Sequence, residues 1–284
     1  MEIPTSQLDL FIANASDISP KEQIDLMARC WFALDKRIRT ESIIHRSGDD
    51  WVSVSAGKKG LASIFDNDVL LFVISHYMDA INRGVAPKEL GRRFQFTAYE
   101  YFVFVGKKHI GGRDYVELWK KLQRLQGTVV NTNIRTDNQT TQHAFNWLSE
   151  IKQIKEGNHH RGFEVVVPSW IHDSVVNKKL VLTLNPGYFQ LTSGLQRFLY
   201  LFGRKSSGRQ ITGWTESVVS LHRKSSSRSP IHKFRSNLKR AIQSGHILDY
   251  KVRPVDGDIR YGVKFSLDRE AIGTDNQRDS RVLL

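Results

Sequence analysis

The segment from Ser225 to Gly245 constrains the fold more than any other part of this chain. A serine-rich turn ends at Pro230, which suits the first position of a helix because its missing N–H would have no partner there. Gly245 is well placed to end such a helix. Between them, apolar residues recur at helical spacing and predict one buried stripe: Ile231, Phe234, Leu238, Ala241 and Ile242.

The opposite face of this predicted helix is basic and able to form hydrogen bonds. It carries His232, Lys233, Ser236, Lys239, Arg240 and Gln243 when each residue is set about 100° from the last. Two β-like runs follow, at 246–253 and 259–266, and a turn at 254–258 joins them. A helix of this kind followed by a β-ribbon is the layout of a winged-helix DNA reader. A solvated amphipathic helix beside an ordinary hairpin is the alternative.

The charge of the chain favours a polyanionic partner. The 284 residues include 42 Lys and Arg against 29 Asp and Glu, which gives a formal net charge of +13 and a pI near 9.8. The excess is concentrated, since residues 192–270 hold 16 basic and 6 acidic residues whereas residues 100–165 hold 10 and 7. A chain that needed charge only for solubility could spread it evenly, so the concentration of basic residues indicates a binding role. We expect the partner to be nucleic acid and not an acidic membrane.

The rest of the composition predicts a folded protein of a reducing compartment. Hydrophobic residues make up 40% of the chain, which is enough for real cores. No apolar run approaches the roughly 20 residues that a bilayer span needs, and no secretory leader is recognisable. Cys30 is the single cysteine, so an internal disulfide is excluded. We therefore expect a cytoplasmic protein, associated with the nucleoid or a plasmid, without a membrane partner.

The first half of the chain predicts a helix, a strand, two helices and a ribbon, in that order. Short strands at 31–34, 37–45 and 51–55 come first, with a turn at 46–50. The expected elements are then a helix at 69–82 capped by Asp66 or Asn67, a strand at 93–97, helices at 98–105 and 113–126, and a ribbon of 128–134 with 145–154 whose tip is 135–141.

The second half repeats this order more loosely. Its expected elements are a strand at 163–167, a helix from Pro168 to about 177, an extended stretch at 180–184, a turn at 185–187, a helix at 195–205, a strand at 210–212, a helix at 215–224, and the Pro230 helix with its ribbon. The fold class we predict is α+β, with two winged-helix domains in tandem, each with a helical core and a β-ribbon wing. We place an N-terminal arm at 1–29, the first domain at 30–167, the second at 168–270 and a flexible tail at 271–284.

The helix predicted at 113–126 resembles the Pro230 helix in design. Its expected buried stripe is Tyr115, Leu118, Trp119, Leu122 and Leu125. Arg113, Lys120 and Arg124 share the far face. Glu117 stands among them and can pair with Lys120 or Lys121, which weakens the electrostatic case. Because Trp119 lies at a core position, we do not expect it to stack on bases.

No residue pattern predicts an enzyme, a cofactor site or a metal site. His159 and His160 are adjacent, whereas the paired histidines of metal-dependent nicking initiators need a spacer residue to share one face of a strand. We expect a turn there, between Gly157 and Gly162. The segment Gly57–Ser63 lacks phosphate-loop spacing, and no Cys/His zinc spacing occurs.

A series of short motifs, in matching order and spacing, runs from about Gln7 to Ser266. They are Gln7–Ala13, Ser19–Gln23 with Met27, Lys59–Asp68, Ile81–Gly84, Phe94–Ala98, Leu125–Thr128 with Asn131–Asn133, Val181–Leu184 with Tyr188 and Phe189, and Ser229-Pro230 with Lys233–Arg235. On these motifs the chain resembles the plasmid replication initiator protein A family. An extra Arg-Ser pair beside the serine run before Pro230 leaves the assignment intact.

The resemblance implies a tandem winged-helix protein that binds repeats at a plasmid origin, promotes its opening and recruits the host initiator and helicase machinery. It also implies a homodimer in one state and, in some members, repression of their own promoter. The charge, helix faces and ribbons independently indicate sequence-specific binding of double-stranded DNA. A winged-helix transcriptional repressor is the nearest alternative, and a nicking or priming enzyme is the alternative from another class.

The residues that we expect to bind DNA lie on the far faces of the two helices, in the turn before Pro230 and on the last ribbon. They are Arg113, Lys120, Arg124, Arg228, His232, Lys233, Ser236, Asn237, Lys239, Arg240 and Arg260. Residues near the start of a recognition helix usually reach base edges, while ribbon residues hold phosphates. Arg235 falls beside the apolar stripe, where its stem can pack and its head emerge at the rim. The early strands are expected to leave a sheet edge able to pair with a second copy.

Overall fold

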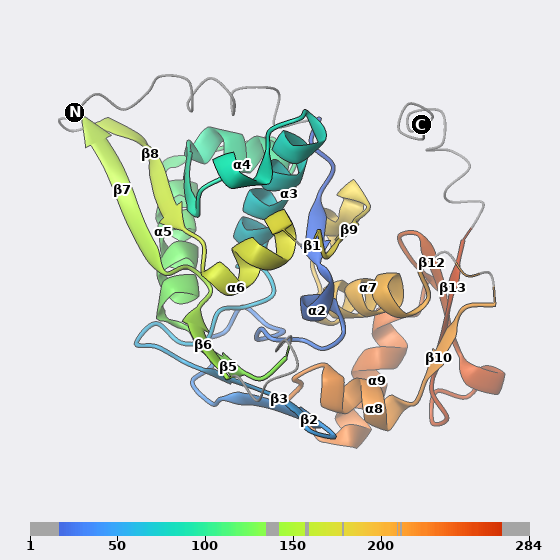
Figure 1. The fold of residues 1–284 in the computed structure, drawn as a ribbon. Helices are drawn as coiled ribbons and strands as arrows, with labels where there is room; N and C mark the ends of the chain where they lie inside the picture. Colours follow the sequence, from blue (N-terminus) through green and yellow to red (C-terminus); the bar gives the residue numbers. More distant parts are fainter. Residues whose placement is uncertain are drawn as a thin grey trace. The chain divides into compact units, whose positions relative to one another are not determined.

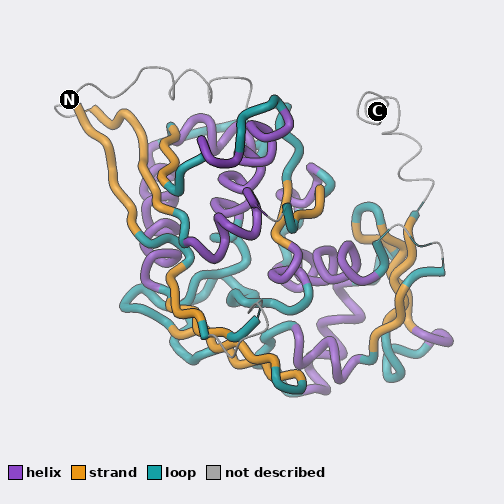
Figure 2. The backbone as a smooth tube through the Cα atoms, viewed as in Figure 1, coloured by secondary structure: helices purple, strands orange, loops and turns teal. Residues whose placement is uncertain are grey.

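The computed structural model describes residues 17–134, 142–156, 159–177, 179–208, 210 and 212–268, and Figures 1 and 2 show their path. They divide into two compact units. Residues 17–24 and 31–183 form the first unit, and residues 25–30 and 184–268 form the second. The sequence placed the boundary at 167/168 and set residues 1–29 apart as an arm. No helix in these described ranges is both long and apolar enough to cross a bilayer.

A helix, a strand, two helices and two strands follow one another in the first unit. They are α3 (Asp68–Asn82), β4 (Arg93–Phe96), α4 (Ala98–Phe104), α5 (Gly112–Gly127), β7 (Glu150–Glu156) and β8 (His159–Val166). The three strands form an antiparallel sheet in the order β4-β8-β7, so the last strand lies between the other two. The helices agree with the sequence prediction to within one or two residues, and Thr97 caps α4 through a capping box with Glu100.

Two further sheets complete the first unit. One has the order β2-β3-β5-β6, from β2 (Ile43–Ser47), β3 (Asp50–Ser55), β5 (Val129–Thr132) and β6 (His143–Asn146); the other pairs β1 (Lys21–Gln23) with β9 (Val181–Thr183). The short helix α6 (Ser169–His172), a π-helical turn (Asp173–Asn177) and a 3-10 turn (Pro87–Glu89) lie between strands. The prediction that Pro168 begins a helix is confirmed, although Pro168 itself is its N-cap.

Two strand predictions and one turn prediction in the first unit were wrong, and one ribbon prediction was right only in part. The expected ribbon of 128–134 with 145–154 is right only where β5 pairs with β6, with Val130 opposite Phe145. The later residues of the expected ribbon lie in β7, which pairs with β8. Its expected tip, 135–141, lies outside the described residues. Residues 31–34 form only one isolated bridge, and the strand predicted at 37–45 begins at Ile43. His159 and His160 lie in strand β8 instead of a turn.

The core of the first unit surrounds α3, which is apolar on nearly all sides and is buried along almost its whole length. Phe72 at its centre meets Phe96 of β4 and Phe104 of α4, with ring centroids 5.2 and 5.3 Å apart. These edge-on contacts tie the helix to the sheet and to α4. A second aromatic cluster joins Trp31 to Trp147 at 5.9 Å.

The second unit repeats the order of the first. It contains α2 (Ile24–Met27), whose first residue belongs to the first unit, a 3-10 turn (Pro186–Gln190), α7 (Gly194–Ser206), β10 (Trp214–Glu216), α8 (Val218–Lys224), α9 (Ile231–Ala241), β11 (His246–Ile247), β12 (Tyr250–Pro254), a 3-10 turn (Val255–Gly257) and β13 (Val263–Leu267). The sheet has the order β10-β13-β12-β11. As in the β4-β8-β7 sheet, the last strand along the chain, here β13, therefore lies between two earlier ones, β10 and β12. Figure 1 shows α7, α8 and α9 on one side of this sheet.

The sequence misplaced the first strand of this unit. The strand is Trp214–Glu216 instead of 210–212, and α8 starts at Val218 because the Ser217 side chain caps it. Gly213, directly before β10, allows the chain to come close to β13. Its φ is +73°, and an added Cβ would lie 2.0 Å from the Phe265 carbonyl oxygen. The approach of β10 to β13 therefore requires a glycine at this position.

A carboxylate is buried at the start of the first unit. Glu22 of β1 accepts a hydrogen bond from the Gln23 backbone N–H at 2.9 Å, and the Asn67 side-chain amide donates to its other oxygen. Burial raises the pKa of Glu22 to about 8, against the opposing effect of these two hydrogen bonds, and the nearby Asp68 carboxylate raises it further. Glu22 therefore holds a proton at neutral pH in the folded state.

We expect Glu22→Gln to change how stability depends on pH. The folded pKa of about 8 exceeds the ordinary value of 4.5, so the contribution of this group is full below pH 4.5 and is lost as pH rises to 8. The wild type should lose a few kcal/mol, at about 1.4 kcal/mol per pKa unit, which the variant does not lose. Thermal melts from pH 5 to pH 9 measure this difference. Melting curves that stay parallel at every pH would contradict it.

Candidate nucleic-acid interface

Helix α9 presents the face that the sequence predicted. Phe234, Leu238 and Ala241 are buried, and α9 packs against α7 and α8. The exposed side chains are His232, Lys233, Ser236, Lys239 and Arg240, with Asn237 half-buried at the margin. The helix begins at Ile231, one residue later than predicted, because Pro230 is extended and acts as the N-cap. One side of α9 therefore offers cations and hydrogen-bonding groups to solvent.

The turn before α9 is held by its own serines and by a histidine. The Ser229 backbone N–H donates to the Ser227 hydroxyl at 3.3 Å, and the Ser227 N–H donates to the Ser225 hydroxyl at 3.3 Å. His222 of α8 bonds the Ser229 carbonyl at 2.7 Å, and its ring lies 4.9 Å from that of Phe234. These contacts fix the start of the helix, where Arg228 is also exposed.

The hairpin of β12 and β13 carries Arg260 in its loop. The Arg260 Nε donates to Asp258 at 2.7 Å, and this bond holds the pKa of Asp258 below its usual range. The Arg260 side chain is nevertheless 71% exposed, and the neighbouring Tyr261 is 65% exposed. Gly262 lets the loop return to the sheet, since its φ is +151° and an added Cβ would lie 2.4 Å from the Glu216 carbonyl oxygen.

Arg235 lies beside the apolar stripe of α9, as the sequence predicted. The residue is half-buried, and its Nε is buried with no hydrogen-bond partner among the described residues. Its charge helps to lower the pKa of Asp258, after the larger effect of the hydrogen bonds from Arg260. Arg235 therefore connects the helix electrostatically to the loop of the hairpin.

Helix α5 of the first unit has a buried stripe of Leu118, Leu122 and Leu125, as predicted. Arg113 and Lys120 are exposed, and Lys120 pairs with Glu117 at 2.9 Å. Tyr115 was predicted to be buried but is 38% exposed, and its ring meets that of Phe102 edge-on at 5.7 Å. Trp119 is half-buried and stacks on Phe163 at 6.0 Å, which agrees with a packing role.

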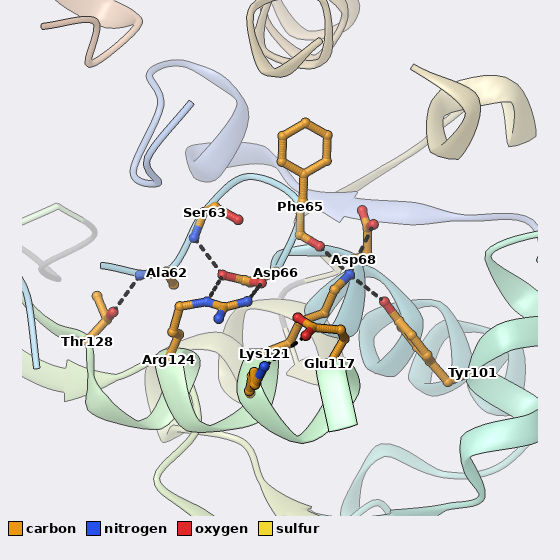
Figure 3. A network of polar contacts seen from close by, with 11 residues as sticks. Ala62, Ser63, Phe65, Asp66, Asp68, Tyr101, Glu117, Lys121, Arg124 and Thr128 are labelled. Carbon is orange, nitrogen blue, oxygen red and sulfur yellow. Dashed lines mark hydrogen bonds and ion pairs between the residues drawn. The ribbon is translucent and has the colours of Figure 1, made fainter. Parts of the chain in front are cut away.

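Arg124 corrects the predicted DNA-binding set. Its Nε and Nη2 donate to the two oxygens of Asp66 at 2.8 and 2.7 Å, and the Asp66 side chain is only 1% exposed. Figure 3 shows the guanidinium turned toward the loop before α3 and away from the far face of α5. A buried carboxylate needs such a partner, so Arg124 anchors α5 and is not available to DNA.

Lys121 is a second anchor, and the sequence analysis did not assign it. Its Nζ donates to the Phe65 carbonyl at 2.7 Å and to the Tyr101 hydroxyl at 3.0 Å, and Asp68 lies 3.8 Å away (Figure 3). The available signal was the Lys-x-x-Arg spacing of Lys121 and Arg124 and the Asp-x-Asp spacing of Asp66 and Asp68, although the sequence predicted only a helix cap at Asp66 or Asn67. Together, Lys121 and Arg124 fix α5 to the loop.

The structure brings the predicted residues together in two separate groups. One group, on α5, keeps Arg113 and Lys120; the other, in the second unit, keeps Arg228, the exposed face of α9 and Arg260. In the part of the chain that the structure describes, no group of three or more His, Cys, Asp or Glu side chains could hold a metal ion.

The order of elements and the small antiparallel sheets define the chain as an α+β protein whose fold recurs in solved structures. It is similar to the crystal structure of domains 2 and 3 of RctB, with a TM-score of 0.60 at 12% identity over 90% of this chain and 99% of that one. A second structure of RctB domains 2–3 gives a TM-score of 0.54 at 12% identity, over 85% and 96%.

The sequence comparisons identify the family. The model of the Replication initiator protein A (RPA) family matches residues 21–252, and the chain belongs to this family. A relative from Wigglesworthia glossinidia brevipalpis, provisionally named as a replication protein, is 30% identical over 253 residues, which cover 86% of this chain and 89% of the relative. The resemblance drawn from the short motifs is thereby confirmed.

We expect Arg124→Gln to lower the free energy of unfolding by about 2–4 kcal/mol, because it leaves the buried Asp66 carboxylate without its cation. Lys120→Gln is the matched control. It removes the same charge from the same helix but breaks only an exposed pair, so its effect should stay within about 0.5 kcal/mol. Urea unfolding of the two variants measures both effects. Equal losses would contradict the anchoring role.

Proposed function

We propose that this chain is a sequence-specific DNA-binding replication initiator that binds double-stranded repeats at a plasmid origin. In this role it promotes opening of the origin and recruits the host initiator and helicase machinery. The observation that carries the proposal is the exposed face of α9, where Lys233, Lys239 and Arg240 stand beside hydrogen-bonding side chains in a chain of the RPA family.

We also propose that each unit is a winged-helix domain. Both units run helix, strand, helix, helix and two strands, with the last strand between the other two. In this reading α5 and α9 are the recognition helices, and the hairpins β7–β8 and β12–β13 are the wings. A recognition helix reaches base edges from its exposed face, and a wing holds the adjacent backbone.

Within the second unit, different residues are proposed to contact bases and phosphates. Lys233 and Arg240 project from the exposed face of α9 and are placed to contact base edges. Arg260, in the loop between β12 and β13, is placed to contact phosphate. Arg228 and His232 lie at the start of α9, the end that would enter the DNA groove first. Ser236, Asn237 and Lys239 extend the same face of the helix. Arg113 and Lys120 give α5 a smaller role.

We infer that the protein works in the cytoplasm without catalysis and without a cofactor. Family membership supports this, since the family is one of replication initiators. A transcriptional repressor of the same architecture would bind DNA equally well but would not maintain a plasmid that lacks another initiator, so transformation with such a plasmid separates the two functions. A nicking enzyme would convert a supercoiled origin plasmid to open circles in the presence of a divalent metal.

We expect binding to origin DNA to depend steeply on salt. If about 6–10 phosphates are neutralised, log K should fall against log salt with a slope of about −5 to −9. Lys233→Ala or Arg240→Ala should cost about 1–3 kcal/mol on the specific site and relax the preference at particular base pairs. Arg260→Ala should weaken all sequences alike and reduce the slope by about one unit.

Titrations of specific and scrambled duplexes at several salt concentrations measure these effects. If Lys233→Ala and Arg240→Ala weaken both duplexes equally, α9 is a phosphate clamp and base reading must lie elsewhere. A flat dependence on salt would remove the electrostatic basis of the proposal.

We further propose that a homodimer forms through the edge strand β2. The sheet order places β2 at an edge, and Ile44 on it is 63% exposed. An open edge with an apolar side chain is a template for pairing with a second copy. Ile44→Lys should therefore lower the self-association constant about tenfold or more, because it places a charge in the paired edge. Sedimentation equilibrium measures this, and wild-type protein that stays monomeric with and without DNA would contradict the proposal.

A further inference from the structure

The sheet of the second unit has one face turned away from α7, α8 and α9. Its inner face is defined by Phe265 of β13, whose ring centroid lies 5.7 Å from that of Phe202 in α7. Side chains alternate between the two faces of a strand, so the neighbours of Phe265 point outward. The outward set, taken across the sheet, is Thr215, Lys251, Arg253, Lys264 and Ser266.

Two cations stand directly opposite each other on this outer face. The register pairs Arg253 of β12 with Lys264 of β13, and pairs Lys264 with Thr215 on its other side. Both cations are exposed, and no carboxylate among the described residues lies within ion-pair distance of either. Lys251 differs from them because Asp268 lies 3.1 Å from its Nζ. Like charges directly opposite in a sheet are destabilising.

The first unit provides an internal comparison. The corresponding row of its β4-β8-β7 sheet is Gln95, Glu164 and Lys152. There the central position holds a carboxylate, which accepts hydrogen bonds from Arg93 and, at 2.6 Å, from the Gln95 amide. The two sheets have the same strand order but differ in charge at the central position of this row. Glu164 balances the charge in the first unit, whereas Lys264 in the second unit lies beside another cation.

We propose that Arg253 and Lys264 form a second phosphate-binding surface for duplex DNA, distinct from the face of α9. This inference rests on the proposed function. A DNA backbone relieves the repulsion between the two cations by replacing bound counterions, and the Thr215 hydroxyl can donate to the same phosphates. The first unit shows that a charge-balanced row fits this sheet order, so the unbalanced row is not a requirement of the fold.

The position of this surface decides which DNA it can reach. It lies on the side of the sheet opposite α7, α8 and α9. We therefore expect that a straight duplex held by α9 does not reach it. The DNA is therefore either the flank of the same site, bent around the unit, or a separate duplex. Both sources present the same phosphate chemistry.

The test compares full-length wild type with the double variant Arg253→Gln/Lys264→Gln on a minimal duplex and on one with about 20 further base pairs at each end, a length that stiff DNA must bend to wrap. We expect unchanged affinity for the minimal duplex. On the long duplex, affinity should fall roughly 3- to 30-fold and the salt slope should shrink by about two units. Lys58→Gln/Lys59→Gln, which removes two exposed charges from the first unit, is the control and should leave both unchanged.

A bridging assay distinguishes the two sources. Capture of a second, labelled minimal duplex by protein already bound to an immobilised one, lost in the double variant, would identify a separate duplex. Loss confined to the long duplex, without capture, would identify bent flanks. Either result supports the surface.

Stability gives an independent readout. Lys264→Glu creates an opposite-charge pair with Arg253, so its melting temperature should equal or exceed that of wild type while binding to the long duplex falls. A merely structural role for Lys264 predicts the reverse.

Three results would overturn the inference: equal binding of both duplexes by the double variant and wild type together with unchanged capture of a second duplex, an equal loss on both duplexes, or a loss matched by the Lys58/Lys59 control. In each of these cases wild-type binding to the minimal duplex remains, so the proposed function stands. If wild type binds neither duplex, the proposed function fails and the inference fails with it.

Discussion

Burial of Phe234 and Leu238 in the core of the second unit determines which side of α9 meets solvent. An α-helix has one face to bury, and once that face is fixed, every other side chain has a fixed direction. Both side chains are almost wholly inaccessible, and removing a buried Phe typically costs about 3–5 kcal/mol. Lys233, Lys239 and Arg240 are exposed because they occupy positions away from this face. The DNA-binding role proposed for α9 therefore depends on apolar packing.

Helix α5 reaches a similar orientation by other means. Its leucine stripe is buried in the same manner, but Lys121 and Arg124 add polar anchors to the loop before α3. Each anchor uses a cation that would otherwise be free, and Glu117 engages Lys120 as well. Among the cations of α5, Arg113 and the salt-bridged Lys120 remain for a polyanion. The two helices thus share a position in the order of elements while α9 keeps far more of its charge available.

Most helices of the fold could be predicted from the sequence because local signals agreed with the final structure. The Thr97 capping box, the apolar length of α3 and the stripe of α9 are each set by residues within a few positions of one another. Strand partners were predicted less well. Glu150–Glu156 pairs with His159–Val166 and not with 128–134, and an alternating pattern states which face is buried without stating which strand lies beside it.

The same distinction between local and distant signals applies to the candidate site. The exposed face of α9 follows from helical periodicity alone. The loss of Arg124 from the DNA-binding set does not, because Asp66 lies 58 residues away in the sequence and only the folded first unit brings the two together. The unbalanced pair of Arg253 and Lys264 also depends on strand register, which the sequence left open.

Hydroxyl-radical footprinting on the DNA that adjoins the gene tests the central claim, that α9 reads a specific sequence. If α9 reads bases, we expect discrete protected tracts that recur with a common sequence and that disappear when both Lys233 and Arg240 are replaced with Gln, while weak protection of random DNA persists. Uniform protection without repeated tracts, or tracts that survive the double replacement, would contradict it.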